Sequence, residues 1–147
     1  MRVHATAVAR RELESWRGVL LTGAPGSGKS DLALRLIDRG WRLVADDQTF
    51  LWRSGPALYA ALPPAMGRSI SGLIELRGFG ISTTPRPPLA LARIALICDC
   101  LQTAPERLPD PDRRPLLGLS LPRMAVDIRP ASAVLLVEAA LREATRL

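Results

Sequence analysis

The chain is poor in lysine, histidine, cysteine and aromatic residues, and these scarcities restrict the classes of protein to which it can belong. With two cysteines in 147 residues, a disulfide-rich secreted scaffold is excluded. No apolar run approaches the roughly 20 residues of a membrane-spanning helix, and the first residues lack the apolar stretch of a secretory signal. The 48% hydrophobic content suits one globular domain, residues 1–147. We therefore expect a cytoplasmic protein with no membrane partner.

The two cysteines lie two positions apart in the apolar run Ile94–Leu101. Side chains alternate between the two faces of a strand, so Cys98 and Cys100 would share one face. A disulfide between them would be strained, and two ligands make an incomplete metal site. We predict that both are small core residues.

The net charge of +6 raises the question of a nucleic-acid partner. The basic residues, however, are spread along the whole chain, and all but one are arginine. The single lysine, Lys29, lies in a glycine-rich loop, where a slim ammonium is needed rather than a planar guanidinium. We therefore predict no nucleic-acid partner, although an acidic protein surface would still be attracted.

Local signals predict a strand, a loop, a helix and a second strand in the first third of the chain. The apolar run Gly18–Thr22 is typical of a buried strand, and Asp31–Arg39 has apolar residues at helical spacing. Gly40 ends that helix, and Trp41–Ala45 forms the next strand. The two strands are expected to run parallel.

The rest of the chain favours antiparallel strands and a closing helix. A hairpin is predicted from Thr49–Arg53 and Ala57–Ala60, which flank the turn Ser54-Gly55-Pro56. Further predicted elements are a mobile loop at Thr84–Pro88, a strand at Ile94–Leu101, an exposed loop at Ala104–Pro115, short strands at Leu116–Leu121 and Met124–Ile128, and a helix at Ala131–Arg146.

A phosphate-binding motif, G-x-x-x-x-G-K-S, follows the first predicted strand and precedes the helix. It consists of Gly23, Ala24, Pro25, Gly26, Ser27, Gly28, Lys29 and Ser30. Its glycines let backbone N–H groups converge on phosphate oxygens at the positive end of the helix. Lys29 would neutralise the β and γ phosphates, and the Ser30 hydroxyl would bind Mg²⁺. Together with the strand and helix pattern above, the motif predicts an α/β P-loop domain with a mixed, partly antiparallel central sheet and flanking helices. Its ligands are expected to be ATP and Mg²⁺.

Two acidic residues, Asp46 and Asp47, follow the second predicted strand. Parallel strands of a βαβ unit end at the same edge of a sheet, so both carboxylates are expected beside the phosphate loop. One can hold Mg²⁺, directly or through water, and the other can accept the proton of an attacking hydroxyl. The alternative is a solvated Asp-Asp turn that ends the strand.

A third element is Glu75-Leu76-Arg77-Gly78-Phe79-Gly80-Ile81, in which a carboxylate and a guanidinium precede two glycines. By itself it could be a surface ion pair before a turn. Together with the loop and with Val44-Ala45-Asp46-Asp47, in this order, it resembles the catalytic domain of the HPr kinase/phosphorylase family. That family phosphorylates a serine of the phosphocarrier HPr. The resemblance covers the family's C-terminal domain, as in short forms without the N-terminal domain.

The resemblance implies a role for each matching residue. Asp47 would be the base that takes the serine proton. Asp46 is predicted to hold Mg²⁺ from its position beside the loop, as argued above. Ser30 and Glu75 would also ligate Mg²⁺, and Lys29 would contact the transferred phosphoryl group. The resemblance further implies a homohexamer and an HPr-like phosphocarrier as partner.

Two further residues are active-site candidates by the same resemblance. His4 precedes the first strand, as a family histidine does, and Arg107 falls near a functional family arginine. Each has a plain alternative, a bystander near the terminus and an exposed loop charge. One segment departs from the family: residues 126–133 lack its Gly-Arg-Asn, for which Arg129 would compensate in part. The phosphorylase direction is therefore open.

Two other functions share the phosphate loop. A small-molecule kinase would use the same loop and acid, but usually with a longer, arginine-rich lid. A non-catalytic sensor would bind ATP and signal through its shape, with Asp47 only positioning water or metal.

Overall fold

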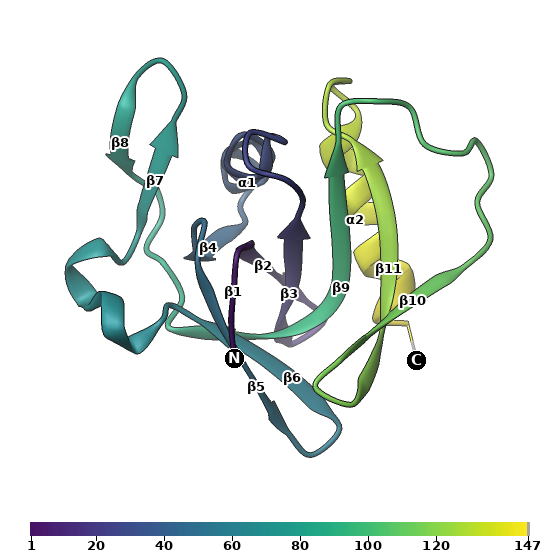
Figure 1. The fold of residues 1–147 in the computed structure, drawn as a ribbon, viewed down its shortest axis with the longest axis horizontal. Coiled ribbons are helices and arrows are strands. Elements are labelled where there is room, and N and C mark those ends of the chain that lie inside the picture. Colours follow the sequence, from purple (N-terminus) through teal and green to yellow (C-terminus); the bar gives the residue numbers. More distant parts are fainter. Residues whose placement is uncertain (147) are drawn as a thin grey trace.

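The computed structural model describes residues 1–146 and all of their side chains except that of Arg68. Eleven strands and two α-helices are found within these residues (Figure 1). They are β1 (Arg2–Val3), β2 (Thr6–Glu12), β3 (Ser15–Thr22), α1 (Lys29–Asp38), β4 (Arg42–Ala45), β5 (Thr49–Ser54), β6 (Ala57–Ala61), β7 (Leu73–Leu76), β8 (Gly80–Thr83), β9 (Leu91–Leu101), β10 (Asp112–Leu116), β11 (Leu119–Asp127) and α2 (Ala133–Ala144), with single 3-10 turns at Pro64–Met66 and Arg68–Ile70.

Nine strands form one curled, mixed sheet in the order β1-β5-β6-β9-β3-β2-β4, and β11 pairs with both β9 and β10. The central strand β9 runs parallel to β3 and β11 but antiparallel to β6. Strands β7 and β8 form a separate hairpin, which stands apart from the main sheet in Figure 1. The predicted α/β fold with a mixed, partly antiparallel sheet and flanking helices is confirmed.

The predicted strand–loop–helix–strand unit is present as β3, α1 and β4. Strand β2 lies between β3 and β4 and is antiparallel to both, so β3 and β4 run in the same direction without touching. The sequence did not predict β2, because its alanines and its charged end, Arg10 to Glu12, have little strand preference and mask the signal of Thr6 and Val8. Pairing on both edges and burial of its first four residues hold it in the sheet.

The C-terminal strands differ from the prediction. The expected exposed loop at Ala104–Pro115 ends early, because Asp112–Leu116 pairs with β11 as a hairpin. The two expected short strands are one strand, Leu119–Asp127, entered through a turn in which Leu117 and Gly118 have φ of 49° and 78°. Strand β10 accommodates Pro115 because it pairs on one edge only.

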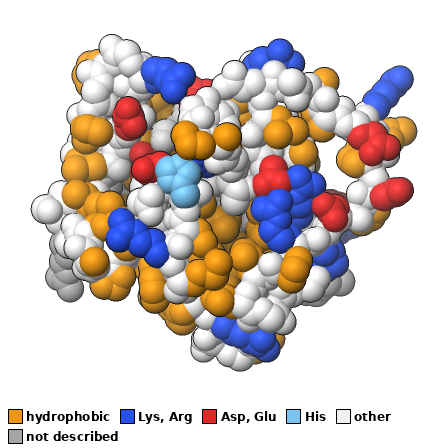
Figure 2. Space-filling view, in the orientation of Figure 1, with side chains coloured by type: hydrophobic (Ala, Val, Ile, Leu, Met, Phe, Trp, Pro, Cys, Tyr) orange, Lys and Arg blue, Asp and Glu red, His pale blue; other side chains and the backbone are white. Residues whose placement is uncertain are grey.

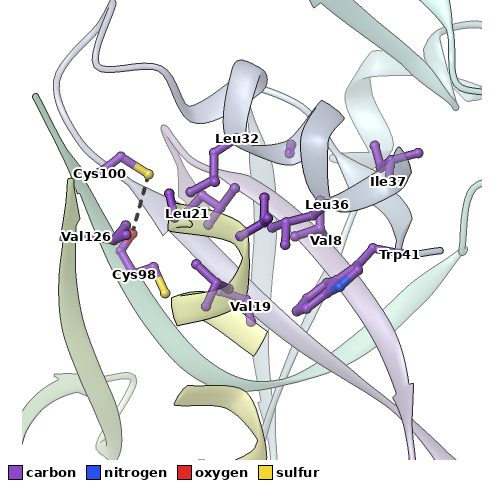
Figure 3. Packing of buried hydrophobic residues seen from close by; sticks show 14 of the residues in the cluster. Val8, Val19, Leu21, Leu32, Leu36, Ile37, Trp41, Cys98, Cys100 and Val126 are labelled. Atoms are coloured by element: carbon purple, nitrogen blue, oxygen red, sulfur yellow. Dashed lines mark hydrogen bonds between the residues drawn. The ribbon is translucent and has the colours of Figure 1, made fainter. Parts of the chain in front are cut away.

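Both helices pack on one face of the sheet and bury the larger apolar cluster (Figure 3). Leu32 and Leu36 of α1 and Leu141 of α2 are fully buried in it, together with Trp41. Both cysteines belong to this cluster, as predicted. Burial raises the pKa of both thiols, that of Cys100 to about 12. Neither described helix is long and apolar enough to cross a membrane.

Candidate active site

A pocket of about 630 Å³ opens where β3 and β4 end. It brings the glycine-rich loop together with residues from the N-terminus, from the turn after β4 and from the β7–β8 hairpin. Its lining consists of His4, Pro25, Gly26, Gly28, Lys29, Ser30, Asp31, Leu34, Asp47, Glu75, Leu76, Arg77, Gln102 and Ile128. The other loop residues, Gly23, Ala24 and Ser27, line an adjacent hollow on the β9 side.

The loop has the shape that phosphate binding requires. Gly23, Gly26 and Gly28 all have positive φ, of 144°, 79° and 97°. A Cβ on Gly28 would come within 2.7 Å of Ile128 Cδ1, and the φ of 97° strains any L side chain there, so glycine is strongly favoured. Helix α1 begins at Lys29 with no side-chain cap. Its first N–H groups therefore face the loop without an intrahelical acceptor, which favours an anion.

The single lysine lies inside this loop. Lys29 is only 6% exposed, and its Nζ donates to the carbonyl oxygens of Gly23 and Ala24 at 3.0 and 3.1 Å. These two bonds hold the ammonium where the loop curls around it. A positive charge in a poorly solvated position interacts strongly with phosphate oxygens.

The Asp46 carboxylate accepts hydrogen bonds from hydroxyl and backbone N–H groups of three other segments. Its Oδ1 accepts from Ser30 Oγ at 2.7 Å and from Thr6 Oγ1 at 2.9 Å, and its Oδ2 accepts from the Glu75 N–H at 3.3 Å. The carboxylate is thus beside the predicted Mg²⁺ ligand Ser30. Carboxylate and hydroxyl oxygens are the ligands that Mg²⁺ prefers, so the donor set fits this ion. Thr6 was not predicted.

Asp47 occupies a tight turn at the mouth of the pocket. Its φ is 67°, and the N–H of Gln48 donates to the Asp46 carbonyl at 2.7 Å across it, closing a three-residue turn. The Asp47 N–H donates to Thr6 Oγ1 at 3.1 Å. This uncommon backbone conformation for a non-glycine residue directs an exposed carboxylate, 62% accessible, toward the loop side.

The only histidine is beside Asp47. His4 Nε2 lies 3.3 Å from Asp47 Oδ1, and Figure 2 shows the pale-blue imidazole on the surface with acidic side chains next to it. On the opposite side, Arg77 reaches from the β7–β8 hairpin to the loop: a Cβ on Gly26 would be 3.5 Å from its Nη2. Glu75 and Arg77 therefore line the pocket rather than a remote surface.

Comparisons with known proteins identify the family of this chain. A sequence model of the HPr Serine kinase C-terminal domain matches residues 13–85. An HPr kinase/phosphorylase of Bordetella pertussis is 37% identical over 136 residues, and one of Azoarcus sp. is 35% identical over 141 residues; each match covers 85% of this chain and 43% of the relative. The chain belongs to the HPr serine kinase family. It spans less than half the length of these two relatives.

A solved structure agrees with the assignment. The HPr(Ser) kinase/phosphatase from Coxiella burnetii superimposes with a TM-score of 0.76 at 27% identity, and the match covers 97% of this chain and 95% of that one. The similarity thus extends over nearly the whole fold and is not confined to the part that carries the motifs.

Two candidates of the HPr kinase domain lie away from the pocket. Arg107 is exposed in the segment between β9 and β10, which loops outward in Figure 1, and it is not among the lining residues. Arg129 pairs with Asp127, with Nη2 2.9 Å from Oδ2. In the departing segment 126–133, the residue that lines the pocket is Ile128.

Gln102 and Ile128 were not predicted as site residues. Gln102 follows β9, and its Nε2 donates to the Gly26 carbonyl at 3.1 Å, which ties the phosphate loop to the neighbouring strand. Neither residue carries a recognisable motif, so only the packing of β9 and β11 against the loop identifies them.

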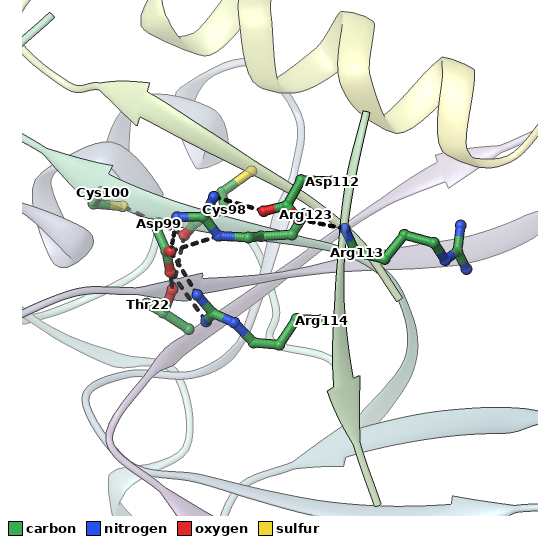
Figure 4. A network of polar contacts seen from close by, with 8 residues as sticks. All are labelled: Thr22, Cys98, Asp99, Cys100, Asp112, Arg113, Arg114 and Arg123. Atoms are coloured by element: carbon green, nitrogen blue, oxygen red, sulfur yellow. Dashed lines mark hydrogen bonds and ion pairs between the residues drawn. The ribbon is translucent and has the colours of Figure 1, made fainter. Parts of the chain in front are cut away.

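An ion-pair network lies next to the residue that precedes the loop (Figure 4). Asp99 accepts from Arg114 Nη2 at 2.6 Å, from Arg123 Nε at 2.7 Å and from the hydroxyl of Thr22, the residue before Gly23. Burial raises the pKa of Asp99, but the hydrogen bonds from Arg114, Thr22 and Arg123 outweigh it and leave the pKa below its ordinary value. The network joins the β10–β11 hairpin to the start of the loop.

Proposed function

We propose that this domain is an ATP-dependent protein serine kinase that acts on an HPr-like phosphocarrier. The observation that carries the proposal is the position of Asp47 in the pocket that Lys29 and Ser30 also line. The names of the relatives supply the acceptor: each is called an HPr kinase/phosphorylase.

The chemistry follows from these positions. A serine hydroxyl of the docked carrier would attack the γ-phosphorus of ATP in line, and the bond between that phosphorus and the ADP oxygen would break. Asp47 would take the hydroxyl proton, while Lys29 and the N–H groups of the loop stabilise charge on the phosphoryl oxygens. Asp47 is exposed enough for the side chain of another protein to reach it.

Ser30, Asp46 and Glu75 would hold Mg²⁺, which when bound neutralises charge on the β and γ phosphates. Asp46 already contacts Ser30 Oγ and the backbone N–H of Glu75. His4 is assigned to the same centre by its contact with Asp47. Arg107 would join from the β9–β10 segment only if the docked carrier draws that segment inward.

We extend the proposal to the remaining features that the family implies: a cytoplasmic homohexamer, with the carrier docked across a subunit boundary. The reverse, phosphorylase direction is also proposed; Arg129 would take the place of the family's basic segment only by leaving its pair with Asp127. Release of phosphate or pyrophosphate from serine-phosphorylated HPr tests that direction separately.

A transfer assay tests the function. The protein is incubated with γ-labelled ATP, Mg²⁺ and HPr, and ATP binding is measured in parallel. Label on an HPr serine is the expected result. Intact ATP binding without transfer would replace the kinase with a nucleotide sensor, and label on small alcohols or sugars alone would replace it with a small-molecule kinase.

A further inference from the structure

Four polar side chains form one chain of contacts that ends at Asp47. Arg2 Nε donates to Gln48 Oε1 at 3.1 Å, Gln48 Nε2 lies 3.2 Å from His4 Nδ1, and His4 Nε2 lies 3.3 Å from Asp47 Oδ1. The sheet register explains the middle contact. Strands β1 and β5 pair Arg2 with Phe50 and Val3 with Thr49, so the next antiparallel step sets His4 opposite Gln48.

The chemistry at both ends of this chain decides where the protons are. A guanidinium can only donate, so the Gln48 carbonyl oxygen must face Arg2 and its NH₂ group must face His4. His4 Nδ1 must then be the unprotonated acceptor, which puts the imidazole proton on Nε2, facing Asp47. A carboxylate can only accept, so this end agrees with the other. With the Gln48 amide reversed, a lone pair on Nε2 would face the carboxylate.

We propose that Gln48, oriented by Arg2, is a positioning residue that selects the Nε2–H tautomer of His4 and so presents a neutral N–H donor to Asp47. The donor would keep one carboxylate oxygen engaged and leave the other for the incoming hydroxyl. This catalytic consequence rests on the proposed kinase function, whereas the tautomer does not.

The protein suits a direct test of this tautomer, because His4 is its only histidine. The full chain is labelled with ¹⁵N and carries no histidine tag. At about pH 8.5, where an ordinary imidazole is neutral, long-range ¹H–¹⁵N spectra then report a single ring. The expected spectrum has a pyrrole-type Nε2 and a pyridine-type Nδ1. A protonated Nδ1, or two nitrogens of averaged character, would overturn the assignment.

A charge-changing variant shows whether Gln48 selects the tautomer. Gln48→Glu replaces the NH₂ donor with a second acceptor, so Nδ1 is expected to become protonated. Gln102→Glu is the matched control: the same change is made at a pocket residue that bonds Gly26 and not His4. It is expected to leave the imidazole signals in place. Unchanged signals in Gln48→Glu would refute the selection.

Transfer kinetics then separate the two claims. Gln48→Glu is expected to lower kcat for transfer by about 10- to 100-fold, as losses of supporting hydrogen-bond partners do, with little change in KM for ATP. An unchanged kcat together with a shifted tautomer would refute the positioning role. If the unaltered protein transfers nothing, the proposed function fails, but the spectra still decide the tautomer.

Discussion

The buried carboxylate of Glu138 provides a stringent test of how the helices are held to the sheet. Its side chain, on α2, is 6% exposed and accepts from Trp41 Nε1 at 3.0 Å. Arg39 Nη2 and Arg10 Nη1 lie 2.8 and 3.2 Å from its oxygens. Arg10 also stacks over the Trp41 ring, 5.4 Å from its centroid. One carboxylate thus connects α2 to β2 and to the segment after α1.

Glu138→Gln keeps the shape, removes the charge and turns an NH₂ group toward donors. Breaking a buried pair costs about 3–5 kcal/mol, and a buried donor left unpaired costs about 1–3 kcal/mol. Arg39 is 45% exposed and regains water in the variant, which reduces the cost of breaking the pair. We therefore expect the free energy of unfolding to fall by about 2–3 kcal/mol, where the two ranges meet. At about 2–4 °C per kcal/mol for a chain of this size, Tm falls by roughly 5–10 °C.

Glu143→Gln is the matched control, since Glu143 lies on the same helix and pairs with Arg146 at 3.0 Å with both side chains more than 70% exposed. Its expected effect on the free energy of unfolding is below about 0.5 kcal/mol. Urea unfolding of the three proteins at pH 7 gives the comparison. Equal effects of the two substitutions would refute the account of the buried network.

The difference in stability between the unaltered protein and Glu138→Gln is predicted to depend on pH. Burial raises the pKa of Glu138, but hydrogen bonds from Arg39 and Trp41 outweigh it and hold the pKa below its ordinary 4.5. A lowered native pKa stabilises the fold above the unfolded value and loses that contribution as pH falls through the native value. The stability gap between the unaltered protein and Glu138→Gln is therefore expected to be full at pH 7 and to shrink below about pH 4.5.

Three further predictions concern the loop and the core. Gly28→Ala is expected to abolish nucleotide binding. Gly40→Ala, also at positive φ but with open space around it, is expected to cost only backbone strain of about 1–2 kcal/mol. Calorimetric ATP titration compares the two variants, and equal ATP affinities would contradict the reasoning. Lys29→Ala is expected to weaken both ATP binding and transfer, measured in the same assays. Because burial keeps the thiols of Cys98 and Cys100 protonated, a thiol reagent at pH 8 is expected to label neither until urea unfolds the chain.

The features that the sequence predicted well are those with local causes. The loop from Gly23 to Ser30 is contiguous, and its flanking strand and helix have clear apolar periodicity. The shared direction of β3 and β4 puts Asp47 at the loop's edge of the sheet, and the turn at Asp47 then aims its carboxylate. The core positions of Cys98 and Cys100 followed from simple alternation along β9.

The features that were missed depend on strand pairing and packing rather than on the residues of each segment alone. Strand β2 contains small residues such as Ala7 and Ala9, and its position comes from a hairpin with the adjacent strand β3 and from pairing with β4, which follows only after α1. Strand β10 contains Asp112 and Pro115, which are typical of a loop, and only its pairing with β11 makes it a strand. The bridging hydroxyl of Thr6 depends on both β2 and the turn after β4.

The assignment of Asp47 as the base is tested most directly by Asp47→Asn, with label transfer to HPr and ATP affinity measured on the same preparation. The neutral amide keeps the shape of the turn but cannot take a proton. Transfer is expected to fall by about 10²- to 10⁴-fold, the usual contribution of a general base, while ATP affinity changes little. Near-normal transfer by Asp47→Asn would contradict the account.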